Sequence, residues 1–202
     1  MLKIISQPIG EGRERACYIH PVDPRLAIKI PTGKTHDQTN RDIKFYRRMK
    51  RIGLAEDAPI PRYHGVAETN LGRGIVVDMI RNYDGEISRP LNWYLGQGVP
   101  IEEFHRFLDE LKQSFLDNQI IFNHDMNIGN LLFQLTSNRS ARLVAIDGLG
   151  DTVALDWLDR IPFLVRRKIE RRWKRFAARI YRSREVRAQR AGTAQAAETS
   201  TS

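Results

Sequence analysis

One short stretch limits what this chain can fold into more than any other. It reads Ile-Phe-Asn-His-Asp-Met-Asn-Ile-Gly-Asn-Leu-Leu-Phe over residues 121–133, and Ala-Ile-Asp-Gly follows at 145–148. The apolar runs are typical of short buried strands, and a hairpin of two such strands would bring Asn130 and Asp147 to the same end. There Asp125 can accept a proton from a hydroxyl, while Asn130 and Asp147 offer the hard oxygen ligands that Mg²⁺ prefers. The alternative is that Asp125 and Asn130 are ordinary turn and cap residues.

A second group of residues, near the N-terminus, has the chemistry of a phosphate site. Gly10 and Gly12 lie in a predicted hairpin turn, where glycine lets backbone N–H groups approach phosphates closely. Lys29 follows at the end of Ala-Ile-Lys, in a strand predicted over residues 26–30, from which its charge would reach the phosphates. Alone, a Gly-x-Gly turn and a strand Lys each have ordinary structural explanations.

These parts occur in the order found in protein-kinase-like phosphotransferases. In that arrangement Lys29 holds the α- and β-phosphates of ATP, and Asp125 orients and deprotonates the acceptor hydroxyl. Asn130 and Asp147 then bind Mg²⁺. The hinge between the two lobes follows a strand predicted over residues 74–80, so Met79 and Ile80 would border the adenine.

We therefore expect an α+β, two-lobed, protein-kinase-like fold in a single domain over residues 1–190. A small antiparallel sheet would form the N-lobe, about residues 1–80, with its first strand over 4–9 and a helix over 38–52. Apolar residues at helical spacing predict the main helix of a reduced C-lobe over residues 100–118, and the C-lobe would extend over about 81–190.

The chain resembles the YrbL family of bacterial proteins, which belongs to the PhoP regulatory network. The resemblance runs from about Gly10 to the basic segment near Lys174. It includes Pro-Arg-Tyr-His-Gly at 61–65, Glu-Thr at 68–69 and Arg-Arg-Trp-Lys-Arg-Phe at 171–176. The resemblance implies a kinase-like fold and a kinase-like activity, but it identifies no phosphoryl acceptor.

Two departures from the kinase pattern concern the nucleotide site. The third glycine of the loop is replaced by Arg15 or Ala16, and no Glu occurs between Lys29 and Glu56. Asp42 is the best substitute for the helix Glu that pairs with the strand Lys in kinases, although it is one methylene shorter. Alternatively, Asp42 only supports the first turn of its helix.

Other departures concern regulation. No Arg separates His124 from Asp125, no Phe follows Asp147-Gly148, and there is no Ala-Pro-Glu motif. We therefore expect no control by activation-loop phosphorylation. The missing glycine, the missing helix Glu and the short C-lobe favour a pseudokinase, a regulatory binding module, as the main alternative. The intact Asp125, Asn130 and Asp147 argue against it.

The basic charge of the chain is confined to one segment. Residues 163–190 contain 12 Lys and Arg against 2 Glu, whereas residues 1–162 are balanced and the whole chain carries +9. Val165, Ile169, Trp173, Phe176 and Ile180 recur at helical spacing. Three interpretations stay open: a final helix docked on the C-lobe with a basic outer face, a helix bound to an anionic membrane surface, or a nucleic-acid-binding segment.

The remaining composition points to a compact protein of the cytoplasm. A single cysteine, Cys17, excludes a disulfide framework and a cysteine zinc site. The N-terminus has no signal pattern, and no apolar run has the length of a transmembrane segment. Residues 191–202 contain no large apolar side chain, so we expect a disordered tail.

Overall fold

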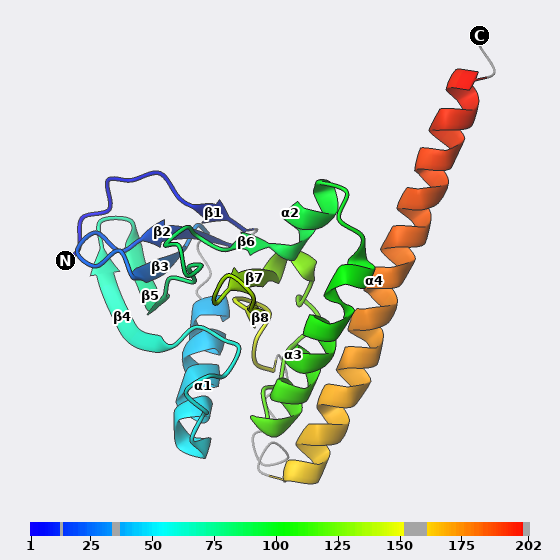
Figure 1. Cartoon of the computed structure of the whole chain (residues 1–202). Coiled ribbons are helices and arrows are strands. Elements are labelled where there is room, and N and C mark those ends of the chain that lie inside the picture. The colour runs from blue at the N-terminus through cyan, green and yellow to red at the C-terminus, as the bar shows by residue number, and fades with distance from the viewer. Residues whose placement is uncertain (13, 34–36, 152–160, 200–202) are drawn as a thin grey trace.

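A five-stranded antiparallel sheet and a group of helices occupy opposite sides of the molecule (Figure 1). The computed structural model describes residues 1–12, 14–33, 37–151 and 161–199, and only the backbone of residues 37 and 183–199. The α+β, two-lobed fold predicted from the sequence is confirmed. The sheet has the order β1-β2-β3-β5-β4. Its strands are β1 (Gly10–Glu11), β2 (Arg15–Ile19), β3 (Leu26–Pro31), β4 (Tyr63–Thr69) and β5 (Gly72–Asp78).

A smaller sheet and the helices form the second lobe. The sheet has the order β6-β7-β8 and carries the predicted hairpin. Its strands are β6 (Arg89–Pro90), β7 (Leu131–Leu135) and β8 (Ala141–Ala145). The helices of this lobe are α2 (Leu91–Gly96), α3 (His105–Asp117) and α4 (Pro162–Thr199), with 3₁₀ turns η1 (Ile101–Phe104) and η2 (Ile128–Asn130).

The predicted first strand over residues 4–9 is wrong. Residues 4–9 form no strand, and β1, which follows them, covers only two residues. The Ile4 backbone is hydrogen-bonded through its N–H and its carbonyl to the side chain of Asn70, at 2.7 and 3.1 Å, while Ile5 is 91% exposed. Ile4 packs on the outer face of the sheet with Ile28, Ile30 and Val76. A side-chain clamp at the β4–β5 turn therefore takes the place of a strand ladder.

A single hydrophobic core joins the two lobes. Helix α1 (Asp37–Ile52) contributes Phe45, Tyr46 and Met49, which are buried between the large sheet and the second lobe. The Tyr46 ring stacks on Tyr63 of β4 with the ring centroids 5.1 Å apart. Because the same core includes residues of α3, β7, β8 and α4, neither lobe buries its apolar face alone.

Helix α4 lies along α3 and extends beyond the rest of the molecule (Figure 1). The predicted apolar stripe is confirmed, since all five of its residues are buried. The indole of Trp173 and the ring of Phe176 pack edge-to-face on Phe122, with centroids about 6 Å apart. The helix continues to Thr199, into the segment predicted to be disordered. Four alanines after Arg190 give that segment a high helix propensity, and residues 200–202 lie outside the described part.

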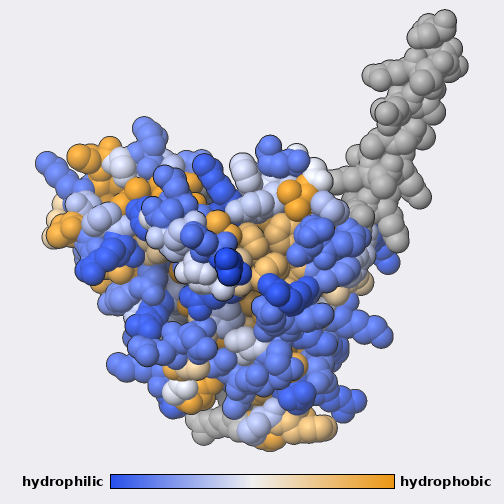
Figure 2. Space-filling view, in the orientation of Figure 1, coloured by the Kyte–Doolittle hydropathy of each residue, from blue (hydrophilic) through white to orange (hydrophobic). Residues whose placement is uncertain are grey.

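The outer surface of the molecule is largely hydrophilic in the view of Figure 2. Among the helices that the structure describes, none combines the length and hydropathy needed to cross a bilayer.

Replacing Phe176 with Ala tests the docking of α4. Phe176 is 1% exposed, so its loss should lower the free energy of unfolding by about 3–5 kcal/mol. Phe163→Ala on the same helix is the matched control: this side chain is 67% exposed, and its loss should change stability by less than about 0.5 kcal/mol. Urea unfolding followed by circular dichroism measures both. Equal losses for the two variants would contradict the docking.

Candidate functional site

The loop over residues 121–130, here called the Asp125 loop, is held by three asparagine side chains. Asn123 accepts a hydrogen bond from the Asp125 N–H at 2.8 Å. The amides of Asn127 and Asn130 both donate to the carbonyl oxygen of Asp125, at 2.8 and 3.1 Å. These bonds fix the backbone of Asp125 and leave its carboxylate, whose side chain is 48% exposed, facing outward.

Backbone contacts bring Lys29 and Asp147 to the same place. The Ile146 N–H donates to the carbonyl oxygen of Asn130 at 2.9 Å, and the Lys29 ammonium donates to the carbonyl of Ile146. A continuous series of contacts therefore runs from Lys29 through Ile146 and Asn130 to Asp125. Asp147 directly follows Ile146 in the sequence. The four residues predicted to act together do lie together.

The glycine after Asp147 is required by sterics. Gly148 has φ +72°, and a Cβ atom there would lie 2.7 Å from the backbone nitrogen of Met126. Its carbonyl accepts the Asn123 N–H at 2.8 Å, and its own N–H donates to the Asp147 carboxylate at 2.8 Å. This close packing holds the segment after β8 against the Asp125 loop.

Arg15 makes a link between lobes that the sequence did not predict. Its guanidinium donates to the carboxylate of Asp42 at 2.5 Å and to that of Asp147 at 2.8 Å, and the residue is only 5% exposed. Asp42 therefore pairs with Arg15, not with Lys29 as predicted. The strand register explains the difference: Cys17 lies opposite Lys29, so Arg15, two residues earlier, projects from the same face. Its longer, forked side chain reaches both acids.

Charge and burial have opposite effects on these acids. Burial tends to raise the pKa of Asp147, but the charges of Lys29 and Arg15 outweigh it and hold the pKa below its ordinary value. Asp42 lies deeper, and burial raises its pKa even though Arg15 and Lys29 offset part of that effect. Burial likewise raises the pKa of the Cys17 thiol, which keeps it protonated and unreactive.

Two further residues of α1 contact the candidate catalytic acids. Gln38 donates to both carboxylate oxygens of Asp147, at 3.2 and 3.3 Å. Arg41 lies 3.4 Å from the carboxylate of Asp125, and the imidazole of His124 lies 3.3 Å from it on another side. Every acid of the site thus has a cationic or amide partner.

The predicted glycine turn and hinge lie at the ends of the strands. Gly10 pairs with Cys17 across β1 and β2, a Cβ at Gly10 would meet nothing within 4 Å, and the Gly12 N–H donates to the Arg15 carbonyl at 2.8 Å. The Met79 N–H donates to the Arg25 carbonyl at 2.8 Å, whereas Ile80 packs on Leu132, Val144 and Ile146.

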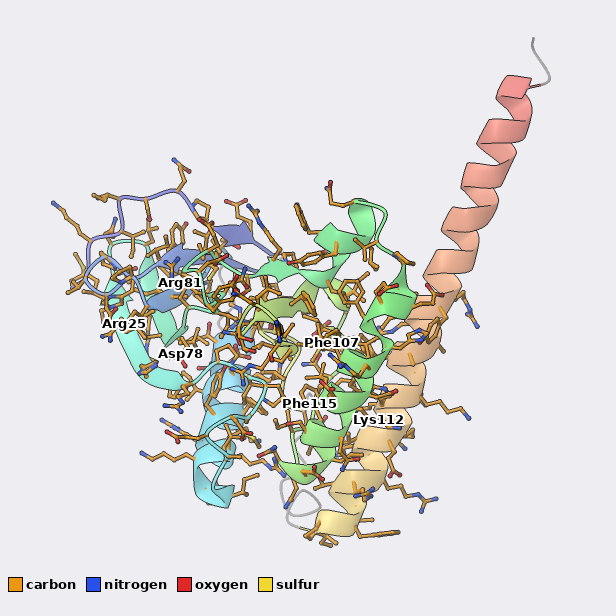
Figure 3. All side chains as sticks on the ribbon, in the orientation of Figure 1. Arg25, Asp78, Arg81, Phe107, Lys112 and Phe115 are labelled. Atoms are coloured by element: carbon orange, nitrogen blue, oxygen red, sulfur yellow. The ribbon has the colours of Figure 1, made fainter. Side chains whose placement is uncertain are left out.

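Arg81 stabilises the hinge just past β5. In Figure 3, Asp78 and Arg81 mark the region where the chain leaves the large sheet. Arg81 donates to the carbonyls of Pro24 at 3.0 Å and Gly85 at 2.8 Å, and its own carbonyl accepts from Gln134 of β7 at 2.7 Å. These bonds hold the segment that follows β5 against both sheets.

The donor set is compatible with a magnesium ion, subject to one exchange. The Asn130 side-chain oxygen accepts no hydrogen bond from the described residues, and Asp147 supplies a carboxylate. Asp147 would first have to exchange Arg15 for the metal. The Arg15 Nε, which is buried and has no hydrogen-bond acceptor in the described part, makes the present pairing incomplete. No group of three or more His, Cys, Asp or Glu side chains suited to a metal occurs in the described residues.

Arginines of α4 hold the Asp125 loop from the other side. Arg172 donates to the Phe122 carbonyl at 2.5 Å, and Arg179 donates to the carbonyls of His124 at 2.8 Å and Met126 at 2.9 Å. Asp151, which follows the Asp147 segment, pairs with Arg172 at 2.8 Å and with Lys168 at 2.6 Å. Part of the basic charge of α4 is therefore used inside the molecule.

The lowered pKa of Asp147 makes a prediction about acid stability. An unfolded Asp titrates near pH 3.9, so the folded carboxylate stabilises the protein above about pH 4, and this stability is lost as the pH falls through the lower folded pKa. Wild type should lose unfolding free energy more steeply than Asp147→Asn between about pH 5 and pH 2. Urea unfolding at each pH measures this. Asp57→Asn, at an exposed position outside the site, should follow wild type, and parallel curves for wild type and Asp147→Asn would refute the assignment.

Comparisons with known proteins identify the fold and the family of this chain. The kinase domain of Mycobacterium tuberculosis PknI superimposes with a TM-score of 0.50 at 15% identity, covering 70% of this chain and 56% of that chain, which supports the kinase-like fold. The YrbL proteins of Escherichia coli (strain K12) and Shigella flexneri are each 34% identical over 185 residues, covering 88% of this chain and 87% of theirs. The family model described as PhoP regulatory network protein YrbL matches residues 5–181, so the chain belongs to the YrbL family.

Proposed function

We propose that this protein is an ATP- and magnesium-dependent phosphotransferase of the cytoplasm that moves the γ-phosphoryl group to a hydroxyl of an acceptor. The observation that carries the proposal is the contact series from Lys29 through Ile146 and Asn130 to Asp125, with Asp147 beside it. It combines a cation for phosphates, two oxygen ligands for a metal and an accessible base.

Each residue has one role in the proposed reaction. Lys29 binds the α- and β-phosphates, and Asp125 accepts the proton of the acceptor hydroxyl. The acceptor oxygen then bonds to the γ-phosphorus as the bond from that phosphorus to its bridging oxygen breaks, releasing ADP. Magnesium bound by Asn130 and Asp147 would neutralise phosphate charge. The Gly10–Gly12 turn would cover the phosphates, with the adenine against Met79 and Ile80.

The charge pairs of the site support this binding. Arg15 pairs with Asp147, and Arg41 pairs with Asp125. An ATP phosphate chain offers both arginines another partner, while magnesium offers one to Asp147. Binding therefore exchanges ion pairs and leaves no charge buried and uncompensated.

A non-catalytic nucleotide sensor is the second candidate, and Arg15 is the observation that favours it. A guanidinium bound to Asp147 can supply the positive charge that magnesium supplies in a kinase. In that case ATP would bind without magnesium, and Asp147 would have no catalytic task.

Thermal unfolding with ATP, in magnesium and in EDTA, separates the two candidates. At about 100 times Kd a ligand adds about 2.7 kcal/mol, which is several degrees for a chain of this size. We expect a stabilisation that requires magnesium and is lost in Asp147→Asn but retained in Asp57→Asn. Equal stabilisation in EDTA would favour the sensor, and no stabilisation in either buffer would exclude nucleotide binding.

Asp125→Ala tests the base. The carboxylate touches the acceptor proton and not the nucleotide, so Mg·ATP affinity measured by calorimetry should change by less than about threefold. The slow release of ADP with water as acceptor should fall by about 10² or more, the typical contribution of a general base. A parallel loss of affinity and turnover would place Asp125 in the nucleotide site instead.

A further inference from the structure

A pocket of about 510 Å³ lies between the Asp125 loop and α4. Its floor is the loop segment Phe122, Asn123 and His124, and its wall is one face of the helix. The wall is formed by Arg172, Arg175, Ala178, Arg179 and Arg182. We propose that this pocket binds the phosphoryl acceptor and that the acceptor is a small molecule that already carries a phosphate group. The acceptor part of this inference rests on the proposed function; the anion site does not.

Most of the positive charge of the pocket has no acid partner among the described residues. No Asp or Glu is among its lining residues, and Arg175 and Arg182 are exposed and have no carboxylate partner in the part of the chain that the structure describes. Arg179 donates only to neutral carbonyl oxygens. Arg172 alone shares its charge with an acid, Asp151. Three guanidinium charges therefore face a common space.

This charge favours phosphate over other anions. A guanidinium presents a planar fork of donors that binds two phosphate oxygens at once, and several forks around one space suit a dianion. The pocket also has apolar surface from the exposed Ala178, and its volume falls within the range of small-molecule sites. A phosphorylated sugar or polyol has the required size, charge and mixed polarity.

The position of the pocket connects it to the proposed chemistry. His124 forms part of the floor, and its imidazole lies 3.3 Å from the carboxylate of Asp125. A molecule whose phosphate is held by Arg175 and Arg182 can direct a hydroxyl across His124 to Asp125. Asp125 then takes that hydroxyl proton as its oxygen bonds to the γ-phosphorus and ADP leaves.

The floor is rigid enough to orient a ligand. Arg172 and Arg179 hold the carbonyls of Phe122, His124 and Met126, so the helix that supplies the anion-binding groups also fixes the loop that carries the base. Binding energy from the phosphate can therefore be used to position the hydroxyl.

The test uses inorganic pyrophosphate as the probe, in magnesium-free buffer of low ionic strength, with binding measured by calorimetry on the full chain. Arg175→Ala/Arg182→Ala should weaken binding at least about tenfold, because two charge-assisted contacts are lost. Arg167→Ala/Lys174→Ala is the matched control: it removes the same charge from exposed positions of the same helix that do not line the pocket, and affinity should stay within about twofold. Equal weakening in both double variants, or no binding by wild type, would overturn the anion site.

Two further measurements keep this proposal separate from the proposed function. Lys29→Met should weaken Mg·ATP and leave pyrophosphate binding unchanged; a loss of pyrophosphate binding in Lys29→Met would move the anion to the nucleotide site and overturn the pocket. If Mg·ATP does not bind but pyrophosphate binding is weakened only by Arg175→Ala/Arg182→Ala, the anion site is supported and the phosphotransferase proposal fails.

For the acceptor role, glucose 6-phosphate should accelerate ADP release in wild type and not in Arg175→Ala/Arg182→Ala. Equal acceleration in both would overturn that role.

Discussion

The candidate site depends on one interaction, the pairing of the buried Arg15 guanidinium with two carboxylates. It joins β2, α1 and the segment after β8, which are far apart in the sequence, through Asp42 and Asp147. A charge with 5% exposure is costly unless it is paired, so the position of α1 against the β7–β8 hairpin depends on the contacts of Arg15 with both acids. Any ligand that takes Asp147 must also satisfy Arg15. Ligand binding and the relative position of the lobes are therefore coupled by charge.

The charge balance of the site is compatible with the proposed binding of a polyanion. Asp42 and Asp147 share Arg15, Asp125 has Arg41, and Lys29 is held by a backbone carbonyl. A polyphosphate adds negative charge and a metal adds positive charge, so each partner released inside the site finds a new one. On binding, the charged groups would exchange ion-pair partners, and few buried charges would be left unpaired.

The sequence predicted what depends on local spacing and missed what depends on tertiary contacts. The hairpin that brings Asn130 and Asp147 together follows from two apolar runs around a turn, and α4 follows from its apolar stripe. The sequence does not reveal the pairing of Arg15, because an arginine next to a glycine turn resembles any exposed strand residue. Only the register with β3, and the inward face it implies, reveals its role. The hydrogen bonds from Arg172 and Arg179 cannot be predicted from the sequence of the loop, because they are accepted by backbone carbonyls, which every residue has.

Helix α4 carries out a task that its composition does not reveal. The chain has neither an Arg between His124 and Asp125 nor an Ala-Pro-Glu motif. Besides the three asparagines within the Asp125 loop, Arg172 and Arg179 of α4 hold this loop from outside, and the apolar stripe of α4 keeps both arginines in place. The arginines on this face of α4 differ in their contacts. Arg172 and Arg179 both hold the loop and line the pocket, whereas Arg175 and Arg182 line the pocket without a bond to the loop among the described residues. For this reason the arginines of this segment argue less for a nucleic-acid surface than for the small-anion pocket proposed above.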